Sequence, residues 1–247
     1  MRSGRRAVVT GGGRGIGRAI AAALTAAGHE VIVLGRSEEK LRAVVEAGEA
    51  VAYYVVNVTD ETALAATVAR VLPVDILVNN AGIADSARFA RTDLAFFRRL
   101  MAVNFESAVT AIHGVLPGMI ERGFGRIISV ASMAGLKGYP YVTAYVASKH
   151  AIVGLTRALA REVATTGVTV NAVCPGYVDT DLVADSAARI ASRTGRTVDE
   201  ARAELIRDNP QGRFITPEEV ADAVVWLSGD LAGAVTGEAI PVAGGES

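Results

Sequence analysis

Short, largely apolar runs recur along the first three quarters of the chain, and segments with helical spacing of apolar positions separate them. Continuous apolar runs are typical of strands buried on both faces of a parallel sheet. Right-handed crossovers place the connecting helices over those faces. The alternation therefore predicts an α/β protein with an open, doubly wound parallel sheet and helices on both faces. The expected strands are Ala7–Thr10, Val31–Leu34, Ala52–Val56, Ile76–Val78, Gly125–Val130 and Thr169–Val173, and the expected helices are Arg14–Ala27, Glu38–Ala47, Glu61–Val71 and Ala144–Thr165.

The alternation breaks at Asp181–Gln211, which holds short helical patches and no obvious strand. Insertions at the carboxyl edge of such a sheet commonly cover a ligand. Because no linker or repeat interrupts the chain, we expect one domain over residues 1–247, with a small substrate lid at about residues 181–211. The alternative is a helix pair on the surface or at a subunit interface. The segment contains Arg189, Arg193, Arg196, Arg202 and Arg207.

Composition narrows the possible partners and the compartment. With 25 basic and 26 acidic side chains and a net charge of -1, the chain gives no reason to expect nucleic acid or an anionic membrane as a partner. Its single cysteine, Cys174, excludes an intramolecular disulfide framework, and its histidines are too scattered to form a metal site. No apolar run reaches the roughly 18 residues of a membrane span, and no targeting signal is evident. We therefore expect a cytoplasmic protein without a metal.

A glycine-rich loop follows the first expected strand directly and leads into the first expected helix. It reads Gly11-Gly12-Gly13-Arg14-Gly15-Ile16-Gly17. Glycines there allow a tight turn and close backbone approach, while the helix N-terminus offers free N–H groups and a positive dipole to a pyrophosphate. The loop predicts dinucleotide binding; the alternative is an ordinary flexible turn.

The end of the second expected strand indicates which dinucleotide is preferred. Folds that select NAD usually place an acid there to bind the ribose 2′-hydroxyl, whereas a 2′-phosphate requires arginine. Here Arg36 stands at that position, and Arg14 in the glycine loop can reach the same phosphate. The pattern favours NADP(H), with NAD(H) still possible; the alternative is that both arginines are solvated surface charges.

The spacing of Thr10, Gly11, Gly15 and Gly17 resembles that of the short-chain dehydrogenase/reductase family. Further motifs of that family follow in the same order, so the resemblance extends from about residue 7 to about residue 245. It implies a single-domain Rossmann-type fold and an oxidoreductase that acts on CH–OH groups. These motifs are Asn79-Asn80-Ala81-Gly82, Asn104, Ser132, Tyr145-x-x-x-Lys149 and Pro175-Gly176.

Tyr145 and Lys149 are four residues apart, so a helix places them on one face. A free phenol is a weak acid, and a nearby ammonium favours its ionised form, so we expect Lys149 to lower the pKa of Tyr145. The resemblance implies that Tyr145 exchanges a proton with the substrate oxygen and that Ser132 donates a hydrogen bond to it. It also implies that Lys149 binds the nicotinamide ribose, and that Asn104 bends its helix and holds a water of a proton relay. For Asn104 a purely structural role is the alternative.

The resemblance also assigns the cofactor-binding residues. Asn57 and the Asn80-Ala81-Gly82 turn correspond to contacts with adenine and its ribose, although Asn and Gly are also ordinary turn residues. The segment from Pro175 to Thr180 corresponds to a nicotinamide carboxamide site, with Val178 and Thr180 in contact. The full expected set is Gly11, Arg14, Gly15, Ile16, Gly17, Arg36, Asn57, Val58, Asn80, Ala81, Gly82, Tyr145, Lys149, Pro175, Gly176, Val178 and Thr180.

The substrate is harder to infer than the reaction. The chain looks like 3-oxoacyl thioester reductases, aromatic polyketide ketoreductases and 3-hydroxybutyrate dehydrogenases. We favour a small-molecule 3-oxoacyl thioester, because the five lid arginines could bind phosphates of CoA or of a carrier protein. Thr165-Thr166 replace a basic residue that carrier-protein reductases often have, which favours CoA. The alternatives are a free 3-hydroxy acid, a polyketide or other cyclic alcohol, and a regulatory protein that binds the dinucleotide without catalysis.

Two further expectations rest on the resemblance. The family is usually tetrameric or dimeric, and the Ala-rich helices fit apolar subunit contacts, so we expect a homotetramer or a homodimer. Seven residues are candidates for the substrate pocket, unless they serve only to pack the loops. They are Ala134, Gly135, Lys137, Tyr139, Tyr141, Tyr177 and Leu182.

Overall fold

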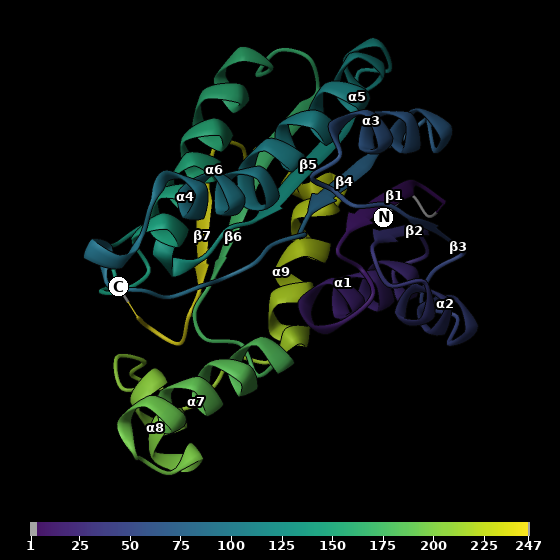
Figure 1. The fold of residues 1–247 in the computed structure, drawn as a ribbon. Helices are drawn as coiled ribbons and strands as arrows, with labels where there is room; N and C mark the ends of the chain where they lie inside the picture. The colour runs from purple at the N-terminus through teal and green to yellow at the C-terminus, as the bar shows by residue number, and fades with distance from the viewer. Residues whose placement is uncertain (1–3, 247) are drawn as a thin grey trace.

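The computed structural model describes residues 4–246, and of residues 182, 185 and 193 it describes the backbone alone. Seven parallel strands form one sheet in the order β3-β2-β1-β4-β5-β6-β7, with helices on both of its faces (Figure 1). This arrangement confirms the expected doubly wound α/β fold. The strands are β1 (Arg6–Thr10), β2 (Glu30–Gly35), β3 (Ala52–Val55), β4 (Ile76–Asn79), β5 (Gly125–Val130), β6 (Val168–Pro175) and β7 (Ala239–Val242).

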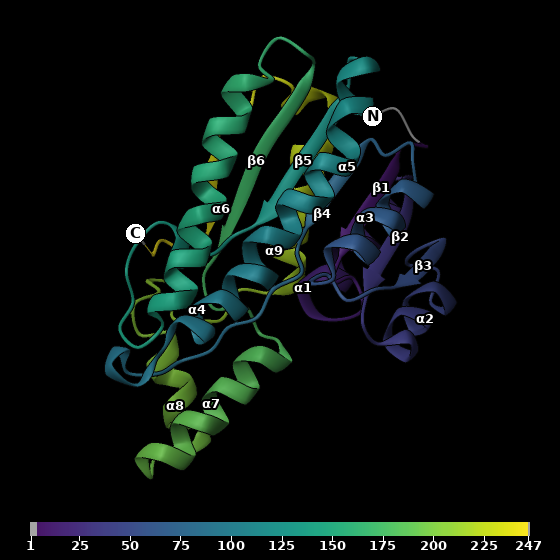
Figure 2. The same cartoon turned by 45° about the horizontal axis from the view of Figure 1, so that its top comes forward.

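Two helical layers enclose the sheet. One contains α1, α2 and α9, and the other contains α3, α4, α5 and α6 (Figure 1). Figure 2 shows α7 and α8 together, extending beyond the main body of the fold. The helices are α1 (Gly15–Ala26), α2 (Glu38–Glu46), α3 (Glu61–Arg70), α4 (Leu94–Met101), α5 (Ser107–Glu121), α6 (Thr143–Glu162), α7 (Asp181–Thr194), α8 (Val198–Leu205) and α9 (Pro217–Ser228).

The pleat of β1 explains why the sheet needs both layers. Successive side chains of a strand point to opposite faces. Ala7 and Val9 pack in the cluster formed with α1 and α9, whereas Val8 packs in the cluster formed with α3 and α5. All three are fully buried, so neither face of the strand meets water. None of the helices in the described part of the chain is long and apolar enough to cross a membrane.

Two element ends differ by more than one residue from the sequence-based expectation, the carboxyl ends of β6 and α6. The strand expected over Thr169–Val173 runs from Val168 to Pro175, because β7 pairs with its last residues on the outer side. The helix expected to reach Thr165 ends at Glu162. The backbone N–H and hydroxyl of Thr166 both donate to the Val163 carbonyl, at 2.9 and 2.7 Å, so a local turn replaces the last helical bonds.

The amino ends of the strands carry a cluster of cationic and aromatic side chains away from the glycine loop. The guanidinium groups of Arg5 and Arg126 lie 3.7 and 4.3 Å from the ring centre of Phe124. His29, immediately before β2, is buried beside them, and neither ring nitrogen has a hydrogen-bond partner among the described residues. Burial lowers the pKa of His29, and the charge of Arg5 lowers it further, against weaker opposing effects of Asp230 and Asp75.

This depressed pKa predicts a loss of stability in mild acid. Below the ordinary histidine pKa of about 6.5 the unfolded chain takes up a proton that the folded chain refuses, so the free energy of unfolding falls as the pH falls. One such proton contributes at most about 1.4 kcal/mol per pH unit. Urea titrations at several pH values should show a shallower acid loss in His29→Gln than in the wild type. His113→Gln, which alters an exposed histidine, should keep the wild-type slope; equal slopes in all three proteins would contradict the assignment.

Candidate active site

A cleft of about 1310 Å³ lies at the carboxyl ends of the central strands. Doubly wound sheets bind ligands at this edge, where neighbouring crossovers diverge from β1 and β4 to opposite sides. All seventeen residues expected to bind the cofactor line this one cleft, although they come from many separate segments of the chain. Ser132 and the candidate pocket residues Ala134, Tyr139, Tyr141 and Tyr177 also line it.

The glycine loop is locked to the end of β4 by hydrogen bonds. The Asn80 side-chain amide donates to the carbonyls of Thr10 and Gly11, at 3.0 and 3.2 Å. In return the Thr10 hydroxyl accepts from the backbone N–H groups of Asn80 and Ala81, both at 3.0 Å. The carboxyl ends of β1 and β4 are therefore held at one fixed separation.

This loop fits a dinucleotide. A Cβ atom at Gly17 would lie 2.3 Å from the Gly11 carbonyl oxygen and 2.4 Å from Asn80 Nδ2, so only glycine lets the first turn of α1 approach so closely. Arg14 caps α1 without a side-chain hydrogen bond, so the cap leaves the first N–H groups of the helix for a ligand. Free N–H groups and a helix dipole at the mouth of a cleft suit a pyrophosphate.

The two arginines expected at the adenosine end both line the cleft. Arg36 is exposed at the carboxyl end of β2. Arg14 pairs with the Asp181 carboxylate at the start of α7, at 3.6 Å, and both side chains are largely exposed. Ser37 and Lys40 line the cleft beside Arg36, and the sequence analysis did not single them out.

Tyr145 and Lys149 lie one turn apart on α6, as their spacing predicted. The Lys149 ammonium is buried, donates to the Val130 carbonyl at the end of β5 at 2.8 Å, and lies 5.7 Å from the Tyr145 ring centre. Burial lowers the pKa of Lys149 to about 8. This lysine is therefore fixed in place, and it holds its proton less strongly than an ordinary lysine does.

The pKa of Tyr145 is raised, whereas the sequence analysis expected the neighbouring ammonium to lower it. Burial raises the pKa of Tyr145, and the hydrogen bond with Ser132 lowers it by less. Ser132 itself caps a short 3-10 helix, Met133–Gly135, by accepting from the Ala134 N–H at 3.1 Å. The phenol is thus protonated, and a hydroxyl group lies beside it.

Asn104 does not line the cleft but fixes two of the segments that do. It lies in a π-helical turn, Ala102–Glu106, between α4 and α5. Its amide oxygen accepts from the Ile83 N–H at 2.8 Å, and its amide nitrogen donates to the Ile83 carbonyl and the Ser148 hydroxyl at 3.0 and 2.9 Å. Asn104 therefore ties the loop after β4 to the helix that carries Tyr145.

Three pocket candidates remain, and none of them is shown to line the cleft. Gly135 and Lys137 do not line the cleft, and the side chain of Leu182 lies outside the described residues. Gly135 is buried against α6, and a Cβ there would lie 2.8 Å from the carbonyl oxygen of Lys149. Side chains that the sequence did not point to also line the cleft. They include Asp85, Arg99, Ser186 and Glu246.

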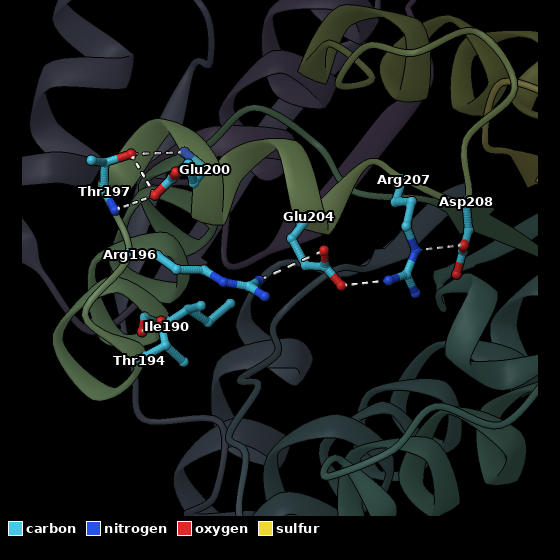
Figure 3. Close-up of polar contacts among 8 residues, drawn as sticks. All are labelled: Ile190, Thr194, Arg196, Thr197, Glu200, Glu204, Arg207 and Asp208. Atoms are coloured by element: carbon cyan, nitrogen blue, oxygen red, sulfur yellow. Dashed lines mark hydrogen bonds and ion pairs between the residues drawn. The ribbon is translucent and has the colours of Figure 1, made fainter.

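The arginines of the expected lid are mostly engaged with carboxylates of the same region. Figure 3 shows Arg196 and Arg207 on either side of Glu204, and Arg207 also contacts Asp208. Arg202 pairs with Asp179 at 2.9 Å. Arg189 lines the cleft, and the side chain of Arg193 lies outside the described residues. Of the four described, one is therefore placed to meet a ligand in the cleft.

Comparison with known proteins places this site in a family. Residues 5–191 match the family described as short chain dehydrogenase. The chain belongs to that family. The match confirms the resemblance and the enzyme class inferred from the motifs, because members of this family are oxidoreductases. Among the side chains that the structure describes, no group of three or more His, Cys, Asp or Glu is arranged to hold a metal ion.

Three relatives show how broad the family is near this chain. It is 37% identical to D-beta-hydroxybutyrate dehydrogenase and 38% identical to acetoacetyl-CoA reductase, both of Rhizobium meliloti, and each alignment covers 98% of both chains. A crystal structure of a variant actinorhodin polyketide ketoreductase with NADPH superposes with a TM-score of 0.93, at 39% identity. That alignment covers 98% of this chain and 97% of the ketoreductase.

The close contact at Gly17 predicts that a methyl group there disrupts the loop. Gly17→Ala should lower stability and raise the KM for the dinucleotide, because the new Cβ overlaps the Gly11 carbonyl and the Asn80 amide. Overpacking of this kind typically costs about 1–3 kcal/mol. Thermal unfolding and initial-rate kinetics provide the measurements.

Gly13→Ala is the matched control in the same loop. Its Cβ would meet Lys40 Cβ at 3.3 Å, a contact that a shift of a few tenths of an ångström relieves, whereas the 2.3 Å contact at Gly17 requires a much larger one. Gly13→Ala should lower the thermal stability of the protein clearly less than Gly17→Ala does. Equal losses in the two variants would show that the packing at Gly17 is not what shapes the loop.

Proposed function

We propose that this short-chain dehydrogenase is an NADP(H)-dependent reductase of 3-oxoacyl thioesters, with CoA esters favoured. The observation that carries the proposal is the arrangement of Tyr145, Ser132 and Lys149 in the wall of a cleft whose glycine loop fits a dinucleotide. A protein that only bound the dinucleotide would have no need of a protonated phenol with a hydroxyl beside it and a buried ammonium in the same wall.

The geometry assigns a role to each group. When bound, the reduced dinucleotide supplies a hydride to the carbonyl carbon of the substrate. The Tyr145 hydroxyl, kept protonated by burial, gives its proton to the carbonyl oxygen, so that ketone, hydride and proton together yield a secondary alcohol. Ser132 donates a hydrogen bond to the same oxygen as negative charge develops there. Lys149 stabilises the resulting phenolate with its ammonium and binds the ribose hydroxyl groups.

Asn104 acts in this proposal as a positioning residue. Its bond to the Ser148 hydroxyl, which in turn donates to the Tyr145 carbonyl at 2.8 Å, orients the first turn of α6. In this proposal Asn104 also holds a relay water, which the spacing supports: a Cβ at Gly82 would lie 3.4 Å from Asn104 Oδ1 and 3.7 Å from Lys149 Nζ. The backbone at Gly82 thus leaves space between the amide and the ammonium.

The preference for NADP(H) rests on Arg36 and Arg14. Both line the cleft, and a 2′-phosphate would make charge-assisted hydrogen bonds with their guanidinium groups. Arg14 would exchange its exposed Asp181 partner for the phosphate, at small cost because exposed pairs contribute little. The related ketoreductase structure with NADPH supports the same choice.

The choice of substrate rests on charge at the mouth of the cleft. Arg99 of α4 and Arg189 of α7 both line it, and α7 with α8 forms the proposed lid. Arg99 pairs with Asp85 at 2.7 Å while remaining half exposed, so it can also meet a phosphate of CoA. The acetoacetyl-CoA reductase among the relatives supports a thioester, and the hydroxybutyrate dehydrogenase supports a similar four-carbon acyl group without one.

Assembly and compartment complete the proposal. We propose a homodimer or homotetramer, since large apolar side chains such as Leu231, Leu94 and Phe89 stand exposed in the single chain, at 100, 69 and 69%. We also propose a cytoplasmic location, which the lone buried thiol of Cys174 supports.

The deciding experiment follows NADPH oxidation with acetoacetyl-CoA, free acetoacetate and a bulky cyclic ketone. We expect turnover on the thioester, and Tyr145→Phe should lower kcat by about 100-fold or more because the proton donor is lost. Binding of NADPH, measured by fluorescence, should persist in that variant. The exposed Tyr141 provides the matched control, since Tyr141→Phe removes a hydroxyl from the same cleft wall and should keep most of the activity.

Each other result of this experiment selects an alternative. Turnover of acetoacetate alone would favour a hydroxy-acid dehydrogenase, and turnover of the cyclic ketone alone would favour a polyketide reductase. Tight NADPH binding without turnover of any ketone would favour a regulatory protein. Full activity of Tyr145→Phe would contradict the assigned proton donor.

Cofactor preference can be tested separately at Arg36. Arg36→Asp should raise the KM for NADPH about tenfold or more, because a carboxylate replaces a charge-assisted partner of the 2′-phosphate. The KM for NADH should change less or fall, since the new carboxylate can accept from the 2′-hydroxyl. Arg42→Asp, on α2 and outside the cleft lining, should leave the ratio of the two KM values as in the wild type. Equal changes for both cofactors in Arg36→Asp would exclude the assignment.

A further inference from the structure

A buried carboxylate stands at the substrate end of the cleft. Glu246 lies four residues beyond β7, its side chain is 4% exposed, and it lines the same cleft as Tyr145. The Tyr139 hydroxyl donates to its Oε1, and the Lys137 ammonium lies 3.1 Å from the same oxygen. A buried carboxylate needs partners of this kind, and here both come from the loop before α6.

The backbone around Glu246 holds this carboxylate in place. The Gly176 N–H donates to the Val242 carbonyl at 3.0 Å, and the Gln211 N–H donates to the Gly244 carbonyl at 3.3 Å. A Cβ at Gly176 would lie 3.4 Å from Glu246 Oε2, so the carboxylate packs directly on the loop after β6. The Glu246 carboxylate is therefore packed against that loop on one side and held by the Tyr139 hydroxyl and the Lys137 ammonium on the other.

The Glu246 carboxylate acts on the tyrosines at this end of the cleft. Burial raises the pKa of Tyr139 and of Tyr177, and the Glu246 carboxylate raises both further, as Asp208 does more weakly. Tyr177 in turn contributes to the raised pKa of Tyr145, and all three side chains line the same cleft. The cationic side chains Arg99 and Arg189 line the cleft on α4 and α7 instead.

We propose that Glu246 is a specificity-determining residue that excludes free 3-oxo acids and admits neutral 3-oxoacyl esters and thioesters. Its carboxylate repels a second carboxylate in a poorly hydrated pocket, and it neutralises the Lys137 ammonium that would otherwise attract one. This inference rests on the proposed function. It adds a reason why two substrates with the same reacting ketone are treated differently: the thioester keeps its phosphates at the cationic mouth and presents a neutral group inside.

The test compares acetoacetate with ethyl acetoacetate, which have the same ketone and differ in charge. In the wild type, kcat/KM should be higher for the ester. Glu246→Gln keeps the size of the side chain and an acceptor for the Tyr139 hydroxyl, but it removes the charge. It should raise the ratio of kcat/KM for the acid to that for the ester by about tenfold or more, a change that misfolding alone would not produce.

A second variant shows whether Lys137 causes the rise in the ratio of kcat/KM for the acid to that for the ester. Adding Lys137→Met to Glu246→Gln should remove most of the increase, because the ammonium that lies beside position 246 is then gone. An unchanged ratio in Glu246→Gln would overturn the proposal, and so would a wild-type enzyme that uses acid and ester equally well. A gain that persists in the double variant would overturn the part assigned to Lys137.

Binding to the wild-type holoenzyme keeps the proposal testable if Glu246→Gln does not fold. Butyramide should quench the fluorescence of bound NADPH at concentrations at least about tenfold lower than butyrate does. Equal binding of the two would overturn the charge effect. This arm also separates the two proposals: a wild type that turns over none of the ketones refutes the proposed function, whereas turnover of esters with equal binding of butyrate and butyramide refutes only the role of Glu246.

Discussion

The Asn80 side-chain amide is the contact on which the site depends most. By donating to the carbonyls of Thr10 and Gly11 it joins the ends of β1 and β4, the two strands whose crossovers diverge. The cleft opens at that divergence, and Gly17 can approach within it only because no Cβ intervenes. If this contact were lost, the glycine loop and the strand ends beside the proposed reacting groups would no longer be held in fixed positions relative to one another.

A second set of contacts fixes the proposed reacting groups relative to the glycine loop. The Lys149 ammonium bonds to the last carbonyl of β5, and Asn104 bonds to Ser148, so the first turns of α6 are anchored from two sides. Burial also changes how strongly these groups hold their protons, because it raises the pKa of the Tyr145 phenol and lowers the pKa of Lys149 to about 8. A lysine at the surface would be neither fixed in position nor lowered in pKa in this way.

What the sequence predicted well are features encoded within a few consecutive residues. The buried strands, the glycine loop and the Tyr145-x-x-x-Lys149 pair are such features, and the structure has each where it was expected. The raised pKa of Tyr145 was not predicted, because desolvation depends on every segment packed around the ring. Glu246 was missed for a related reason. It follows the last strand with no local motif, and only the fold brings it beside Tyr139, more than one hundred residues earlier.

The same distinction explains why membership in the family defines the reaction more sharply than the substrate. The proposed reacting groups lie on α6 and in the turn directly after β5, and these segments pack against the sheet, so their displacement would also disturb the core. The substrate end instead combines the loop before α6, the loop after β6, the segment after α8 and the end of β7, none of which the sheet requires in that form. One side chain changed in any of these segments alters the charge that a substrate meets while the proton donor stays in place. Relatives of nearly equal identity can therefore carry names that refer to an acid, a thioester and a polyketide.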